Sequence, residues 1–549
     1  MFYCPNCGGK MVFDIPTQKM KCAYCESIIP PENYNINNNV NESTYETNVY
    51  VCRNCGAELT SPDEQMVSFC SYCGSEAVLA GKLTQENKPK EMIPFRIAKK
   101  QCQEIYKAKV GKALFLPKEM KNEQFLDQFR GIYIPFYSIG VEYPGTSRIM
   151  ASSETHLGGS RYQINTYLLN MMARDEGRYE RDGSAALDDT ITQAISGYTD
   201  KTVGFNPAYL AGFYADRSDV KADQYIQDVQ EEAAVNAQKA MQTELGRRQM
   251  SYAAKVSSSA MTKAGFAPGT VQIADYSHPF QARCTDFFSK LVPVWFLTWR
   301  NKERVSYVVM NGETGNMYTE LPVDKKQYLL MAGVISLVLF AVLSLFFTII
   351  APTMLGITAT LSAVNLIVLT KEMHRLRDKE LHVYDIGSKD YNPENAKFRK
   401  RFKAKPAKAG ASIGVFTMLV IAIAYGFAEG GIDWLFSGGI SHYAVLTVLA
   451  LVSGVIAIVC LIKGIGYGAS LNEKSMTIWP ILNALPLFFA VIVAIWRPVD
   501  DWIYYLSAAL CMAGAFVPAL KLIDLYNLMA TRPLPSFFGR EGANHGLDD

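Results

Sequence analysis

The 549-residue chain has little charge, and the two signs are almost equal in number. Only 19% of its residues are charged, which is below the roughly 25% of average soluble domains. The 54 basic and 52 acidic residues leave a formal net charge of +2. This balance excludes a generally basic nucleic-acid-binding protein and an acidic disordered chain.

Residue sets typical of catalysis are also missing. His156 and His278 each stand without a partner nearby in the sequence. The Gly-Lys pairs at 81–82 and 111–112 lack the G-x-x-x-x-G-K-[ST] context of a phosphate-binding loop. We therefore expect no enzymatic activity and assign no catalytic or cofactor-binding residue.

Cysteine, by contrast, is concentrated at the N-terminus and follows a repeat. Eight of the twelve cysteines lie before residue 75, in four C-x2-C pairs, and the whole pattern recurs after 48 residues. Fourteen residues separate the two pairs of each unit. Two such pairs can place four sulfurs around one ion. The predicted ligands are Cys4, Cys7, Cys22 and Cys25 for one ion, and Cys52, Cys55, Cys70 and Cys73 for a second.

Three chemistries are compatible with this repeat: structural zinc, iron held as in rubredoxin, and a disulfide framework. The spacing is that of metal ligands, and no signal peptide precedes Cys4, so we favour two structural zinc ions in a reducing compartment. The stretches between the pairs alternate apolar and polar residues around a turn, as β-hairpins do. We expect one zinc ribbon at 1–30 and another at 50–79, joined by an Asn-rich linker at 31–49.

The charge of the ribbons indicates the kind of partner they bind. Residues 1–75 contain four basic residues and eight acidic ones. Phosphate binding needs a positive surface, so the ribbons are poor candidates for binding nucleic acid. We expect protein partners instead.

The middle region, residues 91–325, follows a second linker at 80–90 and predicts a cytosolic α+β domain. Residues 131–145 and 160–180 are rich in Tyr, Ile and Leu, which favours strands. Turns at Asn301-Lys302 and Asn311-Gly312 divide the end of the region into three more strands. The sequence around Pro135 is echoed around Pro293, and both prolines are expected at strand ends or edges. A long helix is predicted at 219–265, where Ala, Gln and Glu dominate.

Residues 326–530 predict a helical membrane domain. A helix needs about 20 apolar residues to cross a bilayer, and six segments reach or approach that length. The second segment is short and close to the first, so a re-entrant course is an alternative there. The six segments are Tyr328–Ile350, Met354–Thr370, Ala411–Ala428, Tyr443–Ile462, Ile478–Trp496 and Ile503–Leu525.

The loops between these segments predict the orientation. The loop at 371–410 contains twelve Lys or Arg and six Asp or Glu, which places it in the cytoplasm by the positive-inside rule. With six crossings of the cell membrane, the N-terminus and the tail at 531–549 are then cytoplasmic too. The basic run at 397–408 is a candidate for contact with anionic lipid.

The interior of the predicted spans lacks Asp, Glu, Lys and Arg. Pumps and coupled transporters usually need charge at depth, so we disfavour that class. Asn365 and Asn483 are neutral and are best explained as hydrogen-bonding residues between helices. The sequence does not fix the oligomeric state, and an oligomer remains open.

The opening CPNCGG at Cys4, together with "MIPFRIAKKQ", "GIYIPFYSIGVEYPG", "LVPVWFLTWR" and "VVMNGETGNMYTELPVD", resembles a group of bacterial membrane proteins with transcription factor IIB-type zinc ribbons. The resemblance covers about residues 1–325, and the duplicated ribbon departs from the usual arrangement, which has fewer. Such proteins are often labelled replication-restart helicases, but this chain lacks the phosphate loop of a helicase. The resemblance implies zinc, a membrane and this order of parts, and it implies no reaction.

Together these features predict a multi-domain, multi-pass membrane protein that presents zinc ribbons and a β-rich domain as a protein-docking scaffold. Two alternatives remain. One is a transport or lipid-handling protein regulated by its cytosolic part. The other is a membrane-tethered nucleic-acid-binding protein.

Overall fold

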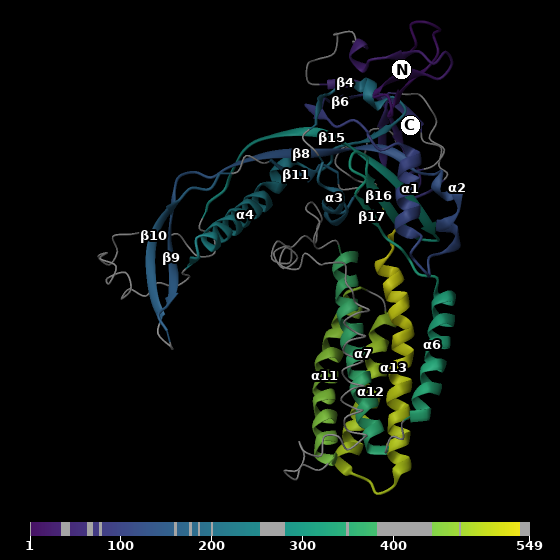
Figure 1. Cartoon of the computed structure of the whole chain (residues 1–549). Helices are drawn as coiled ribbons and strands as arrows, with labels where there is room; N and C mark the ends of the chain where they lie inside the picture. The colour runs from purple at the N-terminus through teal and green to yellow at the C-terminus, as the bar shows by residue number, and fades with distance from the viewer. Residues whose placement is uncertain are drawn as a thin grey trace.

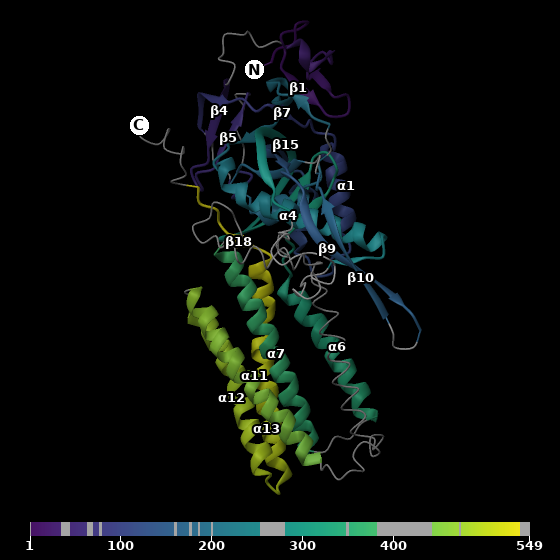
Figure 2. The ribbon, with the colours of Figure 1, turned by 90° about the vertical axis from the view of Figure 1, so that its left-hand side faces the viewer.

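A β-rich domain stands on one end of a bundle of long helices (Figure 1). The computed structural model describes residues 2–34, 44–62, 70–75, 80–158, 162–174, 178–184, 187–198, 201–252, 280–346, 351–381, 442–471 and 474–537. Ribbons seen from the side show the same division into two parts (Figure 2).

The β-rich domain is organised around two long antiparallel strands, β8 (Arg130–Glu142) and β15 (Arg283–Asn301). Their side chains alternate between two buried faces, as the period of a strand requires. Tyr133, Leu291 and Trp295 belong to one hydrophobic cluster. Ile134, Val292 and Phe296 belong to another on the opposite face. The two central strands therefore support a core on each side.

Further strands extend this sheet in the order β12-β7-β15-β8-β13-β5-β4-β6, with β11 beside β8 and β16 beside β15, β17 and β18. The predicted strand-turn-strand-turn-strand pattern at the end of the region is confirmed by β15, β16 and β17. The bounds of the added strands are β4 Thr44–Val51, β5 Glu58–Ser61, β6 Ala80–Asn87, β7 Glu91–Met92, β11 Arg178–Asp182, β12 Val203–Gly204, β13 Tyr214–Asp216, β16 Arg304–Asn311, β17 Met317–Thr319 and β18 Arg532–Pro533.

Pro135 and Pro293 lie inside β8 and β15, so their expected place at strand ends or edges was wrong. On one side of β8 the pairing with β13 ends at Tyr133 and the pairing with β11 begins at Phe136. On the corresponding side of β15, the pairing with β7 ends at Leu291 and that with β16 begins at Val294. Each proline thus falls in a gap between two partner strands, where its missing N–H costs no ladder hydrogen bond.

Short helices cover the sheet. In α1 (Lys99–Val110), Cys102, Tyr106 and Val110 are buried at a spacing of four residues, so they share one face. The side chain of Gln101 accepts a hydrogen bond from the backbone N–H of Ala98 at 3.0 Å, which satisfies one free donor at the start of this helix. The other helical segments are η1 Pro31–Asn33, η2 Lys118–Lys121, α2 Glu123–Leu126, α3 Asp189–Ile195, η3 Pro207–Leu210 and η4 Ala222–Tyr225.

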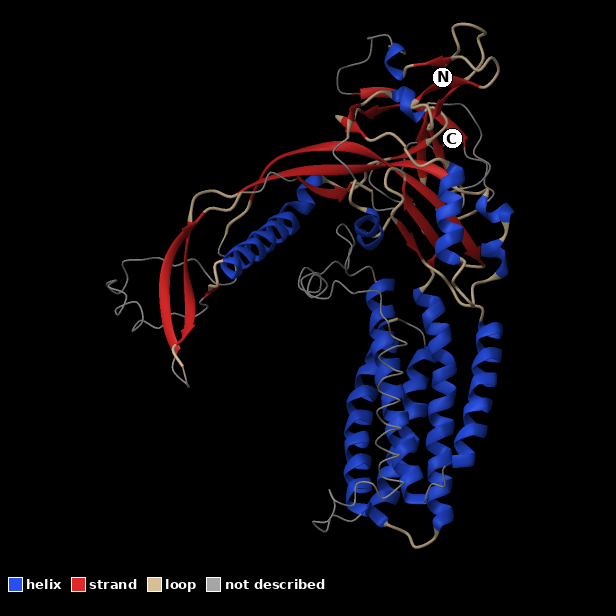
Figure 3. Ribbon diagram, viewed as in Figure 1, coloured by secondary structure: helices blue, strands red, loops and turns tan. Residues whose placement is uncertain are grey.

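An arm projects from the sheet (Figure 3). It consists of the hairpin β9 (Ser147–His156) and β10 (Tyr162–Met171), the short strand β14 (Ser251–Tyr252) and the helix α4 (Ile226–Arg247). The helix predicted at 219–265 is therefore shorter, because the chain turns into β14 soon after Arg247. Residues 253–265 lie outside the described part of the chain.

Five helices in the described residues are long and apolar enough to cross a membrane. The second predicted segment, for which a re-entrant course was the alternative, is one of them. It belongs to α7, which runs for 30 residues and includes the first part of the expected basic loop, 371–380. The third predicted span, 411–428, and the remainder of the loop lie outside the described residues. The five helices are α6 Lys325–Phe346, α7 Ala351–Glu380, α11 His442–Ser470, α12 Lys474–Trp496 and α13 Asp501–Met529.

The two asparagines predicted to join helices do so. The Asn365 side chain on α7 donates a hydrogen bond to the carbonyl of Ala515 on α13, at 2.8 Å. The Asn483 side chain on α12 accepts one from the Ser362 hydroxyl on α7, at 2.7 Å. Helices α7, α11, α12 and α13 share one hydrophobic cluster. By contrast, α6 stands apart in both views (Figures 1 and 2), and the described part of the chain buries none of its residues Lys325–Val342.

Candidate metal centres

Each predicted set of four cysteines comes together in space. The first metal centre consists of Cys4, Cys7, Cys22 and Cys25, and its ligand atoms all lie within 4.8 Å of one another. The Sγ atoms of Cys4 and Cys25 are 3.6 Å apart, and those of Cys7 and Cys22 are 3.5 Å apart.

The second metal centre consists of Cys52, Cys55, Cys70 and Cys73, within the same limit of 4.8 Å. Its Cys52–Cys73 and Cys55–Cys70 sulfur distances are both 3.7 Å. A tetrahedral zinc site with Zn–S bonds of about 2.3 Å places its sulfurs about 3.8 Å apart. All eight cysteines are free, and these distances are far longer than a disulfide bond. The disulfide alternative therefore does not hold, and both sets fit a tetrahedral metal ion.

The same backbone turn builds all four cysteine pairs. After Cys4 and Cys52, the N–H of the residue four positions later donates to the cysteine carbonyl, at 2.8 and 2.7 Å. This residue needs a positive φ, which glycine adopts without strain. Gly8, Gly56 and Gly74 occupy this position, with φ of 69°, 72° and 67°. After Cys22, the residue in the same position is Glu26, with φ 57°.

Serines 48 residues apart support the thiols in both centres. The Ser27 hydroxyl lies 3.0 Å from Cys25 Sγ, and the Ser75 hydroxyl lies 3.0 Å from Cys73 Sγ. Hydrogen bonds from Ser27 lower the pKa of Cys25 to about 6. Hydrogen bonds from Cys55 and Cys70 lower the pKa of Cys52 to about 6. In the second centre, the hydrogen bonds with Cys52 raise the pKa of Cys55 and Cys70. Each centre therefore favours the thiolate, the form that binds metal, at some of its cysteines and not at all four.

The first metal centre is a small separate ribbon that is partly open to solvent. It has its own three-stranded sheet, β1 (Met11–Asp14), β2 (Lys19–Cys22) and β3 (Ile28–Ile29). Cys4 and Cys22 are buried, while Cys7 and Cys25 are exposed. The ribbon rests on the β-rich domain, where Phe13 packs on Tyr209 and its N–H donates to the carbonyl of Ala211 at 3.0 Å.

The second metal centre is not a separate ribbon, because its strands belong to the large sheet. Residues 44–49 and 80–87, expected as linkers, form parts of β4 and β6, which pair along eight residues. On its other side β5 pairs with β13 through Leu59 and Asp216. All four cysteines are buried. The two centres therefore contact opposite faces of the central strands, the first through one hydrophobic cluster and the second through the other.

The segment that follows the last helix reaches the second metal centre. After α13 the chain forms β18, which pairs with β16, and then continues to Phe537. The Phe537 N–H donates to the carbonyl of Cys55 at 2.6 Å, and its ring lies 5.5 Å from that of Tyr72. Tyr72 lies between the ligands Cys70 and Cys73. The last membrane helix is thus linked to a metal-binding loop by a short stretch of chain.

A buried group of charges joins the helices to the β-rich domain at the same place. Arg532 bonds Glu320 at 2.7 Å and Asp188 at 2.8 Å, and Lys379 at the end of α7 bonds Glu320 at 2.8 Å. Burial acts to raise the pKa of Glu320, but the positive charges of Arg532 and Lys379 outweigh it and hold that pKa below 4.5. Arg304 on β16 completes the junction by bonding Glu380 at 2.6 Å.

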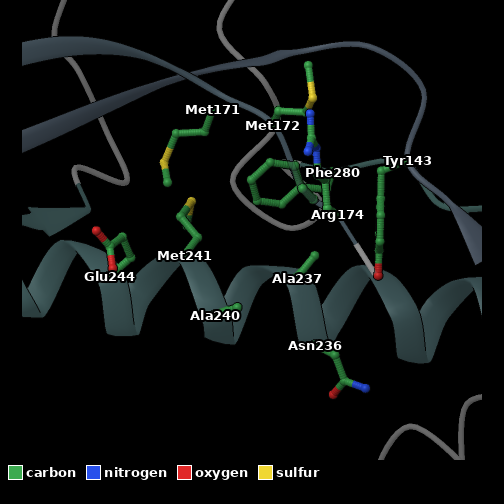
Figure 4. Close-up of a pocket in the computed structure, with 11 residues that line it drawn as sticks. Tyr143, Met171, Met172, Arg174, Asn236, Ala237, Ala240, Met241, Glu244 and Phe280 are labelled. Atoms are coloured by element: carbon green, nitrogen blue, oxygen red, sulfur yellow. The ribbon is translucent and has the colours of Figure 1, made fainter. Parts of the chain in front are cut away.

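One further concavity lies in the arm, between the end of β10 and α4 (Figure 4). It has a volume of about 390 Å³, and Met171, Met241 and Phe280 are among its apolar lining residues. Arg174 and Glu244 are its charged residues. Its described lining residues include no histidine or cysteine, so they offer neither a nucleophilic thiol nor an imidazole ligand for a metal.

Together, the two cysteine clusters, the β-rich domain and the apolar helices define a helical membrane protein with metal-binding clusters outside the helices. The chain is 24% identical over 340 residues to a Bacillus subtilis (strain 168) protein described as uncharacterized protein YdjG. The match covers 59% of this chain and 90% of that protein. No protein-family model matches the chain, and no solved structure matches it.

Proposed function

We propose that this protein crosses the cell membrane several times and displays its β-rich domain and two structural zinc ions in the cytoplasm, as a docking module for another protein. The four thiols of each centre fill a tetrahedral shell, so a bound ion has no open position for substrate. Such an ion holds shape and does not activate water. The basic residues that follow α7 support the cytoplasmic orientation.

The observation that carries the docking proposal is the exposure of three large apolar or aromatic side chains on the first metal centre. Tyr3, Tyr24 and Ile28 are 57%, 77% and 48% exposed. The N-terminal ribbon that carries them is the part of the molecule farthest from the apolar helices (Figures 1 and 2). Exposed aromatic residues held by a rigid scaffold are typical of protein interfaces.

A photo-crosslinking amino acid at Tyr24 tests the proposal in the full-length protein in its native membrane. We expect a discrete protein adduct that disappears when Tyr3 and Ile28 are both replaced by Asp. The same crosslinker at Leu83, which is 65% exposed on β6, is the matched control. Equal adducts at both positions, or no adduct at Tyr24, would refute a docking surface on the first metal centre.

A further inference from the structure

The arm has a fixed direction relative to the membrane helices. In Figure 1 the β9–β10 hairpin curves away from the sheet and turns so that its tip points along the direction of the helices. In both views the tip extends beyond the level at which α6 begins (Figures 1 and 2). The helix α6 begins with Lys325, which pairs with Asp524 on α13 at 2.8 Å, so this level is charged and marks the edge of the apolar bundle.

The hairpin of the arm is packed against the helix α4. Ala237, Met241 and Leu245 on α4 form one buried cluster with Ile149 and Ala151 on β9.

The root of the arm is fixed to the sheet by hydrogen bonds and ion pairs. The Tyr143 hydroxyl donates to the carbonyl of Ala233 at 2.9 Å. Arg181 on β11 bonds Asp228 and Glu232 on α4, at 2.7 and 2.6 Å. These contacts attach the base of the arm to the large sheet and so set the direction in which the hairpin projects.

Two large apolar side chains are exposed near the tip of the hairpin, among the polar residues Thr155, His156 and Gln163, a mixture that suits the polar-apolar boundary of a bilayer. Leu157 and Ile164 are 58% and 66% exposed. The ten residues of β10 include no Asp, Glu, Lys or Arg, although among the described strands β10 is the edge of its sheet. Soluble proteins usually protect such an edge with charge or proline. A strand edge with unpaired backbone groups is not tolerated in the hydrocarbon core. The hairpin therefore fits the interfacial layer, where polar groups of the surroundings can form hydrogen bonds with the backbone.

We propose that the β9–β10 hairpin places Leu157 and Ile164 in the interfacial layer of the bilayer that the helices of the same chain cross. The hairpin then acts as a second point of membrane contact, lateral to the bundle. It fixes the orientation of the β-rich domain over the membrane, in addition to the junction at Arg532 and Glu320.

Fluorescent labelling of the full-length protein in lipid nanodiscs tests this contact. An environment-sensitive probe is attached to Leu157→Cys or Ile164→Cys in a Cys284→Ser background. Cys102, Cys460 and Cys511 are buried, and the other eight cysteines are the proposed metal ligands, which bound zinc protects from labelling. Glu46→Cys, exposed on β4, is the aqueous control, and Leu337→Cys, 71% exposed on α6, is the membrane control. Retention of both metal ions shows that each variant is folded.

We expect the emission of the probes at Leu157 and Ile164 to shift to the blue and to be quenched by lipids carrying a spin label near the headgroup. The probe at Leu337 should be quenched better by a label deep in the acyl chains. The contact is refuted if the hairpin probes behave like the probe at Glu46. It is also refuted if they are shielded from aqueous iodide without lipid quenching, because a protein surface would then cover the hairpin.

Discussion

The backbone N–H of Phe537 donates a hydrogen bond to the carbonyl of Cys55, a predicted metal ligand, at a distance of 2.6 Å. Phe537 follows the last membrane helix by only a few residues, so this bond links the bundle to the second metal centre. Its ring is 5% exposed and packs on Tyr72, between two further ligands. The metal centre and the end of the membrane domain are therefore one packed unit.

Replacing Phe537 by Ala should weaken the second metal centre and leave the first unchanged. Removing a buried Phe side chain costs about 3–5 kcal/mol, and here the lost packing lies on the ligand loop. We expect faster metal release to a chelator from one of the two sites, measured with a metal-sensitive dye. Phe287→Ala, at a position that is 54% exposed, is the control. Unchanged release from both sites in Phe537→Ala would show that the C-terminal segment does not support the centre.

The two centres should respond differently to loss of a ligand. Cys4→Ser should unfold the first ribbon and leave most of the sheet intact, because that ribbon has its own three-stranded sheet. Cys52→Ser should lower the melting temperature of the whole β-rich domain, because its loop belongs to the large sheet and its core. Circular dichroism and limited proteolysis of the full-length variants measure the difference. Equal effects would contradict the integration of the second centre.

Glu320 should contribute a pH-dependent part of the stability. Its pKa in the folded protein lies below the ordinary value of 4.5. The ionised Glu320 carboxylate therefore contributes fully to the free energy of unfolding above pH 4.5, and this contribution is lost as the pH falls through the pKa of the folded protein. Breaking a buried ion pair costs about 3–5 kcal/mol, so Glu320→Gln should melt at a lower temperature than the wild type at pH 7.

The difference between wild type and Glu320→Gln should narrow below pH 4.5. Metal loss in acid affects both proteins, so the difference in melting temperature is the relevant measurement. A difference that stays constant from pH 7 to acid would show that the charge of Glu320 is not involved.

Packing between α12 and α13 depends on the absence of a side chain at Gly514. A Cβ there would lie 2.6 Å from Pro486 Cγ and 3.0 Å from the carbonyl oxygen of Leu482. Small residues allow such close approach of membrane helices. Gly514→Ala should destabilise the bundle by about 1–3 kcal/mol, the usual cost of overpacking. Gly333→Ala on α6 should not destabilise it, because no described atom outside the local helix backbone lies within 4 Å of the added Cβ. Thermal unfolding in detergent compares the two, and equal melting would refute tight packing at Gly514.

The metal ligands could be predicted from the sequence because their spacing alone determines the local turn. The repeat from Cys4 to Cys52 specified both sets of ligands, and the glycines after the pairs agree with the observed turns. What the repeat did not reveal is that one unit is separate and the other is built into a sheet. That difference depends on pairing between residues far apart in sequence, such as Asp216 with Leu59.

Polar composition misled the assignment of the linkers. Residues 80–87 read as a linker because they include Lys82, Gln85 and Asn87, yet they form β6. Among the described strands, β6 is at one end of the sheet order and pairs only with β4, so little of its surface needs to be apolar. The contact of Phe537 with the second centre could not be predicted from the sequence either. A short tail gives no periodic signal, and its partner lies hundreds of residues away.

The most direct test of the account is the metal content of the full-length protein, purified from its membrane in mild detergent. Elemental analysis should give two zinc ions per chain, with one remaining in Cys25→Ser and one in Cys73→Ser. Absence of metal from the folded protein, or iron in place of zinc, would contradict the assignment of two structural zinc centres on which the docking proposal rests.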